Sequence, residues 1–270
     1  MAQVLVALVP ALLWSFYQFG IGALIVTLSS VAFCVLFEFL ITRFLLKTPT
    51  TVGDLSAIVT GVLLAFNVPS NIDIWILAIG ALFAIGVAKM SFGGLGCNIF
   101  NPALAGRIFL LIAYPVQMTT WPTEAGYADV ATGATPLALI GQYVNGADVT
   151  IPSIVDCLVG NTGGSLGEVS AIALLLGGCY LLFRKTITWH IPVSVLLSAF
   201  VFGFLFFGFD AKLAVEELLW GGMMLGAIFM ATDYVSSPMN SRGQLLYGVC
   251  IGFLTMVIRR YGAYPEGMSF

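Results

Sequence analysis

Residues 22–46 read GALIVTLSSVAFCVLFEFLITRFLL, an apolar run whose charged residues are Glu38 and, close to its end, Arg43. An α-helix rises about 1.5 Å per residue, so this run is long enough to cross the roughly 30 Å of hydrocarbon in a bilayer. Its length and composition therefore predict a membrane-spanning helix.

The rest of the chain repeats this pattern. Of its 270 residues, 60% are hydrophobic and 9% are charged, and the mean hydropathy of +1.04 lies far outside the range of soluble domains. We predict an all-α polytopic membrane protein, a single membrane domain over residues 1–270, with about 9–10 transmembrane or half helices. The segments lie near residues 3–19, 22–46, 55–67, 73–90, 100–114, 168–184, 188–208, 214–233 and 242–259. Residues 262–270 end where a new apolar segment begins, which suggests that a final helix follows.

The segments at 55–67 and 100–114 are short for a full crossing and are predicted as half-helices that lie against other protein. A weak internal echo supports a repeat, because Asn101-Pro102 precedes Arg107 as Ser237-Pro238 precedes Arg242. Paired broken helices of this kind are typical of inverted repeats. Chance recurrence of Pro and Arg near helix ends explains the echo equally well.

The basic residues predict the orientation, because Lys and Arg concentrate on the cytoplasmic side. If each segment crosses once, one side of the membrane holds Arg43, Lys47, Lys89, Arg184, Lys185 and Arg242. That side is predicted to be cytoplasmic, with Lys89 at the interface, and the long loop at about 114–167 then lies on the outer side. Arg259 and Arg260 are exceptions to this count.

Composition also excludes several classes of function. The net charge is −3, and the basic residues are scattered, so nucleic-acid binding is not expected. The five cysteines show no CxxC spacing, and His190 is the only histidine. We therefore expect neither a metal site nor a bis-histidine haem in this chain.

The most informative stretch lies in the long outer loop, where residues 129–137 read DVATGATPL. Gly133 lets the chain bend closely and Pro136 stiffens it, so the Thr135 hydroxyl is presented to an approaching group. Asp129, six positions earlier, could orient a metal or that hydroxyl during a transfer reaction. An ordinary turn before an apolar segment is the alternative interpretation.

The same residues match D-x-x-[S/T]-G-A-T, the acceptor signature at which a dedicated flavin transferase attaches FMN. Over nearly its whole length, the chain resembles the family of membrane flavoprotein subunits that includes the D subunit of Rnf complexes and the B subunit of the sodium-pumping NADH:quinone oxidoreductase. The resemblance also includes SFGGLGCNIFNPALAGR at residues 91–107 and ATDYVSSPM at residues 231–239. With little polar sequence before its first helix, the chain is more similar to the Rnf branch.

The resemblance implies that FMN is esterified through its phosphate to Thr135, within a motif that Asp129 heads and that contains Thr132, Gly133 and Ala134. It implies a membrane electron-transfer subunit, which relays electrons coupled to Na⁺ or H⁺ transport, and a second, non-covalent flavin such as riboflavin near the inner side.

The family fold is similar to that of urea and ammonium channels, with two inverted halves. The implied partners are another membrane FMN subunit, membrane and peripheral subunits that carry iron–sulfur centres, the flavin transferase and membrane lipids. The implied location is the inner, or cytoplasmic, membrane of a bacterium or archaeon, with the flavin-attachment loop outside.

A second set of candidate residues surrounds the broken helix. Gly93 and Gly94 would let the backbone approach a planar ring, and Asn98, Asn101 and Arg107 could hydrogen-bond its polar edge. Close helix packing is an equally good reason for the glycines.

Ionisable residues inside apolar runs are costly and suggest function. Glu38 and Asp233 are therefore candidates for an ion path. For Glu38, the alternative is a structural carboxylate that pairs with Arg43 or reaches a partner subunit.

Two other classes of function remain open at this point. Broken helices suit a channel-like transporter for a small polar solute, without flavin, as well as they suit a redox subunit. A scaffold for partner subunits is the third possibility. The acceptor motif favours the redox subunit, because a channel has no use for Thr135 in that context.

Overall fold

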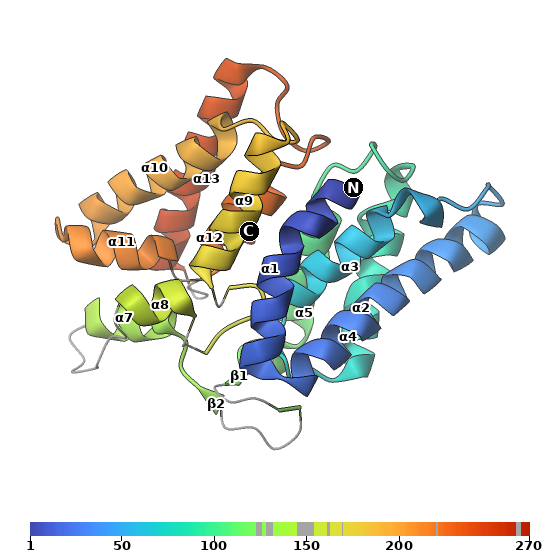
Figure 1. Cartoon of the computed structure of the whole chain (residues 1–270), viewed down its shortest axis with the longest axis horizontal. Coiled ribbons are helices and arrows are strands. Elements are labelled where there is room, and N and C mark those ends of the chain that lie inside the picture. The colour runs from blue at the N-terminus through green and yellow to red at the C-terminus, as the bar shows by residue number, and fades with distance from the viewer. Residues whose placement is uncertain are drawn as a thin grey trace.

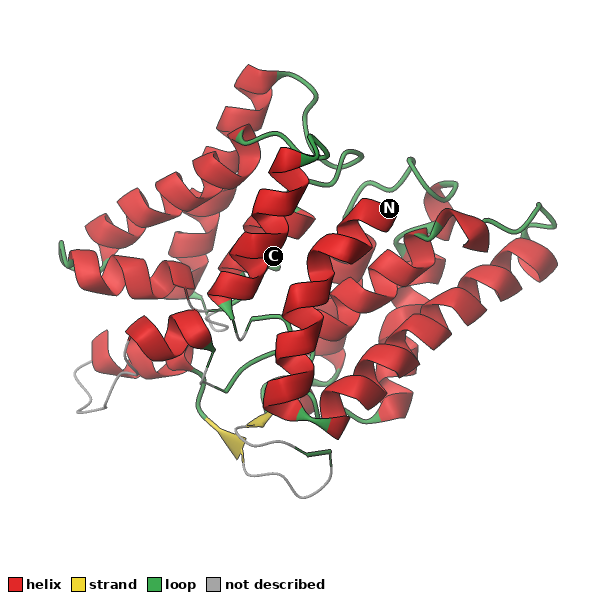
Figure 2. Cartoon of the chain, in the orientation of Figure 1, coloured by secondary structure: helices red, strands yellow, loops and turns green. Residues whose placement is uncertain are grey.

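The computed structural model describes residues 1–122, 126–127, 132–144, 154–160, 163–168, 170–219, 221–262 and 266–270. Almost all of the secondary structure in these residues is helical (Figure 1, Figure 2). The two strands among them, β1 (Trp121–Pro122) and β2 (Thr132–Gly133), form one antiparallel pair in which Trp121 lies opposite Gly133. The prediction of an all-α membrane fold is confirmed.

The helices form two groups that lie side by side in Figure 1. The first group consists of α1 (Ala2–Phe19), α2 (Ile21–Leu40), α3 (Ser56–Phe66), α4 (Ile74–Leu82) and α5 (Pro102–Ala113). Both α2 and α4 continue as π-helical turns, Ile41–Leu45 and Phe83–Val87. The second group consists of α9 (Ala171–Phe183), α10 (His190–Phe206), α11 (Ala211–Leu219), α12 (Met223–Leu225) with the π-helical Gly226–Met230, and α13 (Ser241–Tyr261). The inverted repeat and the likeness to channels stay predictions.

The segment between the two groups carries the strand pair and three short helices, α6 (Pro115–Met118), α7 (Pro136–Val144) and α8 (Ile154–Val159). Of these elements, α7, α8 and the strand pair lie at one end of the molecule, the lower end in Figure 1. Sequence patterns did not predict these helices. Each has nine residues or fewer, too short for hydrophobic periodicity to stand out.

Four helical stretches in the described part of the chain are long and apolar enough to cross a membrane, namely Ala2–Phe19, Ile21–Leu45, Ile74–Phe92 and Ser241–Tyr261. As predicted, α3 and α5 are short, with 11 and 12 residues. The predicted continuous helix at 214–233 is wrong, because the chain bends by 68° between α11 and α12. Gly221 lies in this break with a φ of +71°, a left-handed conformation that glycine adopts without strain.

Small residues determine how the helices pack. In the second group, Gly248 and Gly252 of α13 face Ser194 and Ser198 of α10, and the Ser198 hydroxyl donates a hydrogen bond to the Gly248 carbonyl over 3.2 Å. A Cβ at Gly252 would lie 2.0 Å from Ser198 Oγ. Close approach through small residues replaces the hydrophobic effect, which does not drive helix association within lipid.

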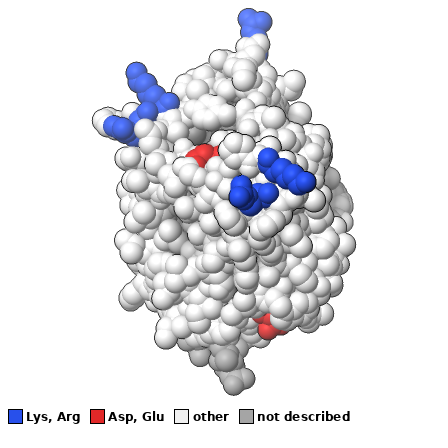
Figure 3. Space-filling view, turned by 90° about the vertical axis from the view of Figure 1, so that its right-hand side faces the viewer, with Lys and Arg blue, Asp and Glu red and all other residues white. Residues whose placement is uncertain are grey.

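Most of the exposed cations lie at the end opposite the strand pair, with Lys212 at the start of α11 as an exception. Figure 3 shows Lys and Arg gathered toward the upper end of an otherwise almost uncharged face. The exposed basic residues that follow α2, follow α9 or begin α13 are Arg43, Lys47, Arg184, Lys185 and Arg242. The side of the membrane on which this end lies stays a prediction. Lys89 differs from the prediction, because it is buried, with 2% of its surface exposed, rather than interfacial.

Candidate functional site

Thr135 lies at the start of α7. Its carbonyl accepts the first helical hydrogen bond, from Leu139 N over 3.0 Å, and its Oγ1 accepts one from Ala138 N over 3.2 Å. Thr135 is therefore the N-cap residue, with Pro136 at the first helical position, where proline is favoured. The Gly-Ala-Thr-Pro sequence thus ends a strand, presents a hydroxyl and begins a helix.

The surroundings of Thr135 hold it in place without covering it. Thr132, Gly133 and Ala134 are exposed and Thr135 is half-buried, whereas Leu137 and Ile140 are buried at 3% and 0% exposure. Leu137 packs beside Gly221, at the break between α11 and α12. The helix is anchored by its apolar face, and Thr135 at its N-terminus remains partly exposed. Asp129, the first residue of the motif, lies outside the described residues.

The glycine-rich loop at 91–101 lies at the opposite, cation-rich end. Gly93 and Gly94 have φ angles of +112° and +91°, so only glycine fits these positions without strain. Asn98 Nδ2 donates to the Phe100 carbonyl over 3.0 Å and to Asp233 Oδ2 over 3.4 Å. This contact brings together the two long motifs of the sequence, 91–107 and 231–239. Asn101 caps α5, because its Oδ1 accepts from Ala103 N over 3.0 Å.

A cavity of about 180 Å³ lies where these motifs meet, with Ser56, Lys89, Asn98, Asn101 and Asp233 among its lining residues. Beside it, Lys89 Nζ lies 2.5 Å from Glu38 Oε2 and 2.5 Å from Ser56 Oγ. Glu38 is fully buried, and Thr51 donates to its other oxygen over 2.6 Å. The basic partner of Glu38 is thus Lys89, not Arg43.

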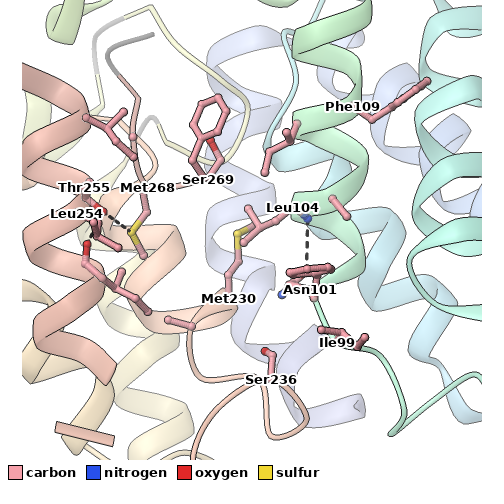
Figure 4. Close-up of a pocket in the computed structure, with 18 of the residues that line it drawn as sticks. Ile99, Asn101, Leu104, Phe109, Met230, Ser236, Leu254, Thr255, Met268 and Ser269 are labelled. Carbon is pink, nitrogen blue, oxygen red and sulfur yellow. Dashed lines mark hydrogen bonds between the residues drawn. The ribbon is translucent and has the colours of Figure 1, made fainter. Parts of the chain in front are cut away.

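A larger cavity of about 760 Å³ lies between α5 and α13 (Figure 4). Its walls are mainly apolar. Figure 4 shows Asn101 and Leu104 on one side, and Thr255 with Met268 and Ser269 on the other. Polar atoms are contributed by Asn101, Ser236, Tyr247 and Thr255, among others. Both cavities share Asn101.

Arg107 lines neither cavity. It is 2% exposed, and its Nη1 donates to Asn67 Oδ1 over 3.3 Å. Its Nη2 forms ion pairs with Glu266 and, over 3.9 Å, with Glu168 Oε1. The structure therefore brings Asn98 and Asn101 together and places Arg107 elsewhere, among carboxylates.

Sequence patterns missed several of these charged residues. Glu168 is the first residue of the predicted segment 168–184, where an interfacial position is expected, and Glu266 lies after the last predicted segment, so the sequence marks neither as buried. The pair of Arg259 and Glu217, whose Nη1 and Oε2 atoms lie 2.8 Å apart, explains why Arg259 departs from the side assignment. Arg259 is buried against a carboxylate, so it does not report the cytoplasmic side. Only the fold reveals that Gly177 lies where α9 packs against α1.

The fold and the helix lengths define a multi-pass helical membrane protein with a strand-and-helix segment at one end. Comparison with known proteins makes the assignment more specific. The model of the NQR2, RnfD, RnfE family matches residues 1–270, and the chain belongs to this family.

Three relatives illustrate the similarity, which extends over the whole of this chain in each case. The D subunit of the Na⁺-translocating ferredoxin:NAD⁺ oxidoreductase complex of Acetobacterium woodii is 47% identical over 272 residues, which cover 83% of its length. The D subunit of the proton-translocating ferredoxin:NAD⁺ oxidoreductase complex of Clostridium ljungdahlii is 38% identical, with 84% of its length covered. The D subunit of the ion-translocating oxidoreductase complex of Stutzerimonas stutzeri is 36% identical, with 85% covered.

Proposed function

We propose that this chain is the D subunit of an Rnf-type, ion-translocating ferredoxin:NAD⁺ oxidoreductase complex, and that it carries FMN linked through its phosphate to Thr135. The family and the relatives named as D subunits support the first part. The observation that carries the second part is the position of Thr135, a partly exposed residue at a helix N-terminus within an acceptor sequence.

The residues present suit a phosphoester at this position. The N–H groups of Leu137 and Ala138 lie in the first turn of α7, the positive end of the helix dipole. An anionic phosphate there is stabilised by about 0.3–1 kcal/mol. The exposed Thr132, Gly133 and Ala134 leave the approach to the hydroxyl open. Flavin supplies one- and two-electron chemistry that the protein side chains lack.

The attachment is tested by mass spectrometry of the peptide that contains Thr135, from the complex matured with its flavin transferase. The proposal predicts an added mass equal to FMN less one water, located on Thr135. A Thr132→Ser variant, which keeps a residue that the motif allows at this position, is the matched control and is expected to keep the adduct on Thr135. An unmodified peptide from the mature wild-type complex would overturn the assignment.

A second, non-covalent flavin such as riboflavin is also part of the proposal. Cofactor pockets have volumes of about 300–1,000 Å³, so the cavity of about 760 Å³ suits a flavin better than the cavity of about 180 Å³. Of the polar residues that the sequence predicted to bind a flavin ring, Asn98, Asn101 and Arg107, it is Asn101 that lines this larger cavity. Denaturation of the complex should release a flavin in addition to the covalent one, and release of none refutes this part.

We further propose that Glu38 and Asp233 flank the inner mouth of an ion path. The support is that Asp233 and Lys89 line the smaller cavity, and that Lys89 binds Glu38. A Glu38→Gln variant should lower the number of Na⁺ or H⁺ transported per electron. An unchanged ratio removes Glu38 from the path.

The cation-rich end supports an orientation in which α7 and the strand pair lie outside the cytoplasmic membrane. In this arrangement, the partners are a second membrane FMN subunit and subunits with iron–sulfur centres, which donate and accept the electrons. Lipid contacts the many exposed apolar side chains, such as Leu13, Leu28 and Leu176.

A further inference from the structure

The helix that begins at Thr135 rests on the break between α11 and α12. In α7, which lies below α11 in Figure 1, Leu137 and Ile140 are 3% and 0% exposed. Leu137 contacts the break itself, because a Cβ added at Gly221 would lie 3.3 Å from Leu137 Cδ2. Ile140 belongs to the apolar cluster that contains Met223, the first residue of α12. Thr135 is therefore two residues from the point where α7 meets the break.

Arg259 reaches the same break from α13. Its Nη1 donates to the Glu217 carbonyl and lies 2.8 Å from Glu217 Oε2. Glu217 is in the last turn of α11, where carbonyls lack an N–H partner within the helix, so the guanidinium caps this helix end. Nη2 of the same guanidinium lies 3.0 Å from the position of a Cβ at Gly221. One side chain thus joins the end of α11 to the glycine in the break.

Arg259 is itself held firmly. The side chains of Arg259 and Glu217 are 1% and 3% exposed, and a buried guanidinium cannot leave its carboxylate without a large cost. Gly267 packs on the aliphatic stem, because its added Cβ would lie 3.4 Å from Arg259 Cγ. Arg259 and Leu137 therefore meet at Gly221 as a fixed side chain and the residue that rests beside it.

We propose that Arg259 is a positioning residue for the flavin linked to Thr135. Arg259 fixes the break, the break supports Leu137, and α7 then determines where the Thr135 oxygen holds the phosphate. This role rests on the attachment of FMN to Thr135 proposed above. A protein contributes to flavin chemistry by placing the ring against its electron donor and acceptor, so a displaced anchor changes both the mobility and the surroundings of the ring.

The test is fluorescence anisotropy and redox titration of the covalent flavin in the whole complex, matured with its flavin transferase. A complex with Thr135→Ala supplies the signal of all other flavins, which is subtracted. The variants are Arg259→Met, Arg259→Lys, Leu137→Ala and the double variant Arg259→Met with Leu137→Ala. Arg260→Met is the matched control, because Arg260 is the next residue of α13 and is partly exposed. In-gel fluorescence of the denatured chain reports how much FMN each variant carries.

Arg259→Met is expected to keep the covalent FMN, with a lower anisotropy and a shifted midpoint potential, whereas Arg260→Met should match the wild type. Arg259→Lys should restore part of both signals, because an ammonium can bind a Glu217 oxygen but lacks the planar fork of the guanidinium. The double variant should show no larger change than the stronger single variant, because both substitutions act through one contact.

Wild-type anisotropy and potential in an Arg259→Met complex that carries the covalent FMN overturn the positioning role. Additive changes in the double variant also overturn it, because Arg259 would then act independently of Leu137. If Arg259→Met does not assemble, Leu137→Ala decides the question, since it leaves the pair with Glu217 intact, and an unchanged flavin signal in it is contrary to the proposal. Absence of covalent FMN from the wild type is a different result, which refutes the attachment at Thr135 itself.

Discussion

Replacement of Lys89 by methionine should destabilise the protein strongly, because it leaves Glu38 charged and buried. The two charged atoms lie 2.5 Å apart, and the side chains are 3% and 0% exposed. At an effective dielectric constant of about 20, their attraction is about 7 kcal/mol, most of which offsets the cost of removing both charges from water. Loss of one partner of such a pair costs about 3–5 kcal/mol.

The measurement is unfolding of the chain by SDS in mixed micelles, followed by tryptophan fluorescence. The double variant Glu38→Gln with Lys89→Met should be more stable than Lys89→Met alone, because no unpaired charge then remains. Lys47→Met is the control. Lys47 is exposed, so its replacement should change the stability by no more than about 0.5 kcal/mol. The reasoning is refuted if Lys89→Met costs no more than Lys47→Met, or if the effects of the two substitutions at Glu38 and Lys89 simply add.

Three further outcomes are expected. Thr135→Val should cost about 1 kcal/mol of stability through loss of the N-cap of α7, measured by the same SDS unfolding, and no change would argue against the capping role. Gly252→Val should cost about 1–3 kcal/mol, because its Cβ would lie 2.0 Å from Ser198 Oγ, whereas Gly53→Ala, with open space at that position, should cost little; equal losses would contradict the packing account. Burial, and next the charge of Asp73, raise the pKa of Tyr127, whose hydroxyl donates to the Ile72 carbonyl. The neutral Tyr127 phenol therefore contributes stability that is fully present below about pH 10 and is lost as the pH rises through the raised pKa. The wild type should lose more stability than Tyr127→Phe between about pH 9 and pH 11. Equal losses would refute this.

The sequence predicted the membrane helices well because each is a long apolar run bounded by charge, glycine or proline. It also predicted the short helices α3 and α5, because Asn67 ends α3 and Asn101 begins α5. The prediction was wrong at 214–233, because apolar residues continue through the break between α11 and α12. The two adjacent glycines at 221–222 are the sequence feature that indicates this break.

The charged interior was less predictable. An ion pair such as Glu38 with Lys89 joins residues 51 positions apart, and only the fold reveals which partners meet. Glu168 precedes α9, at the edge of the predicted segment, and Glu266 follows α13, so local hydropathy does not indicate that either side chain is largely buried. The acceptor motif is different, because its residues act within a few positions of one another.

The proposed redox role depends most on the covalent bond between FMN and Thr135. In-gel flavin fluorescence of the denatured chain tests this bond, after co-expression with the flavin transferase, for the wild type, Thr135→Ala and the control Thr132→Ser. A fluorescent band is expected in the wild type and the control, and none in Thr135→Ala. A band that persists in Thr135→Ala, or a wild type without one, refutes the attachment at Thr135.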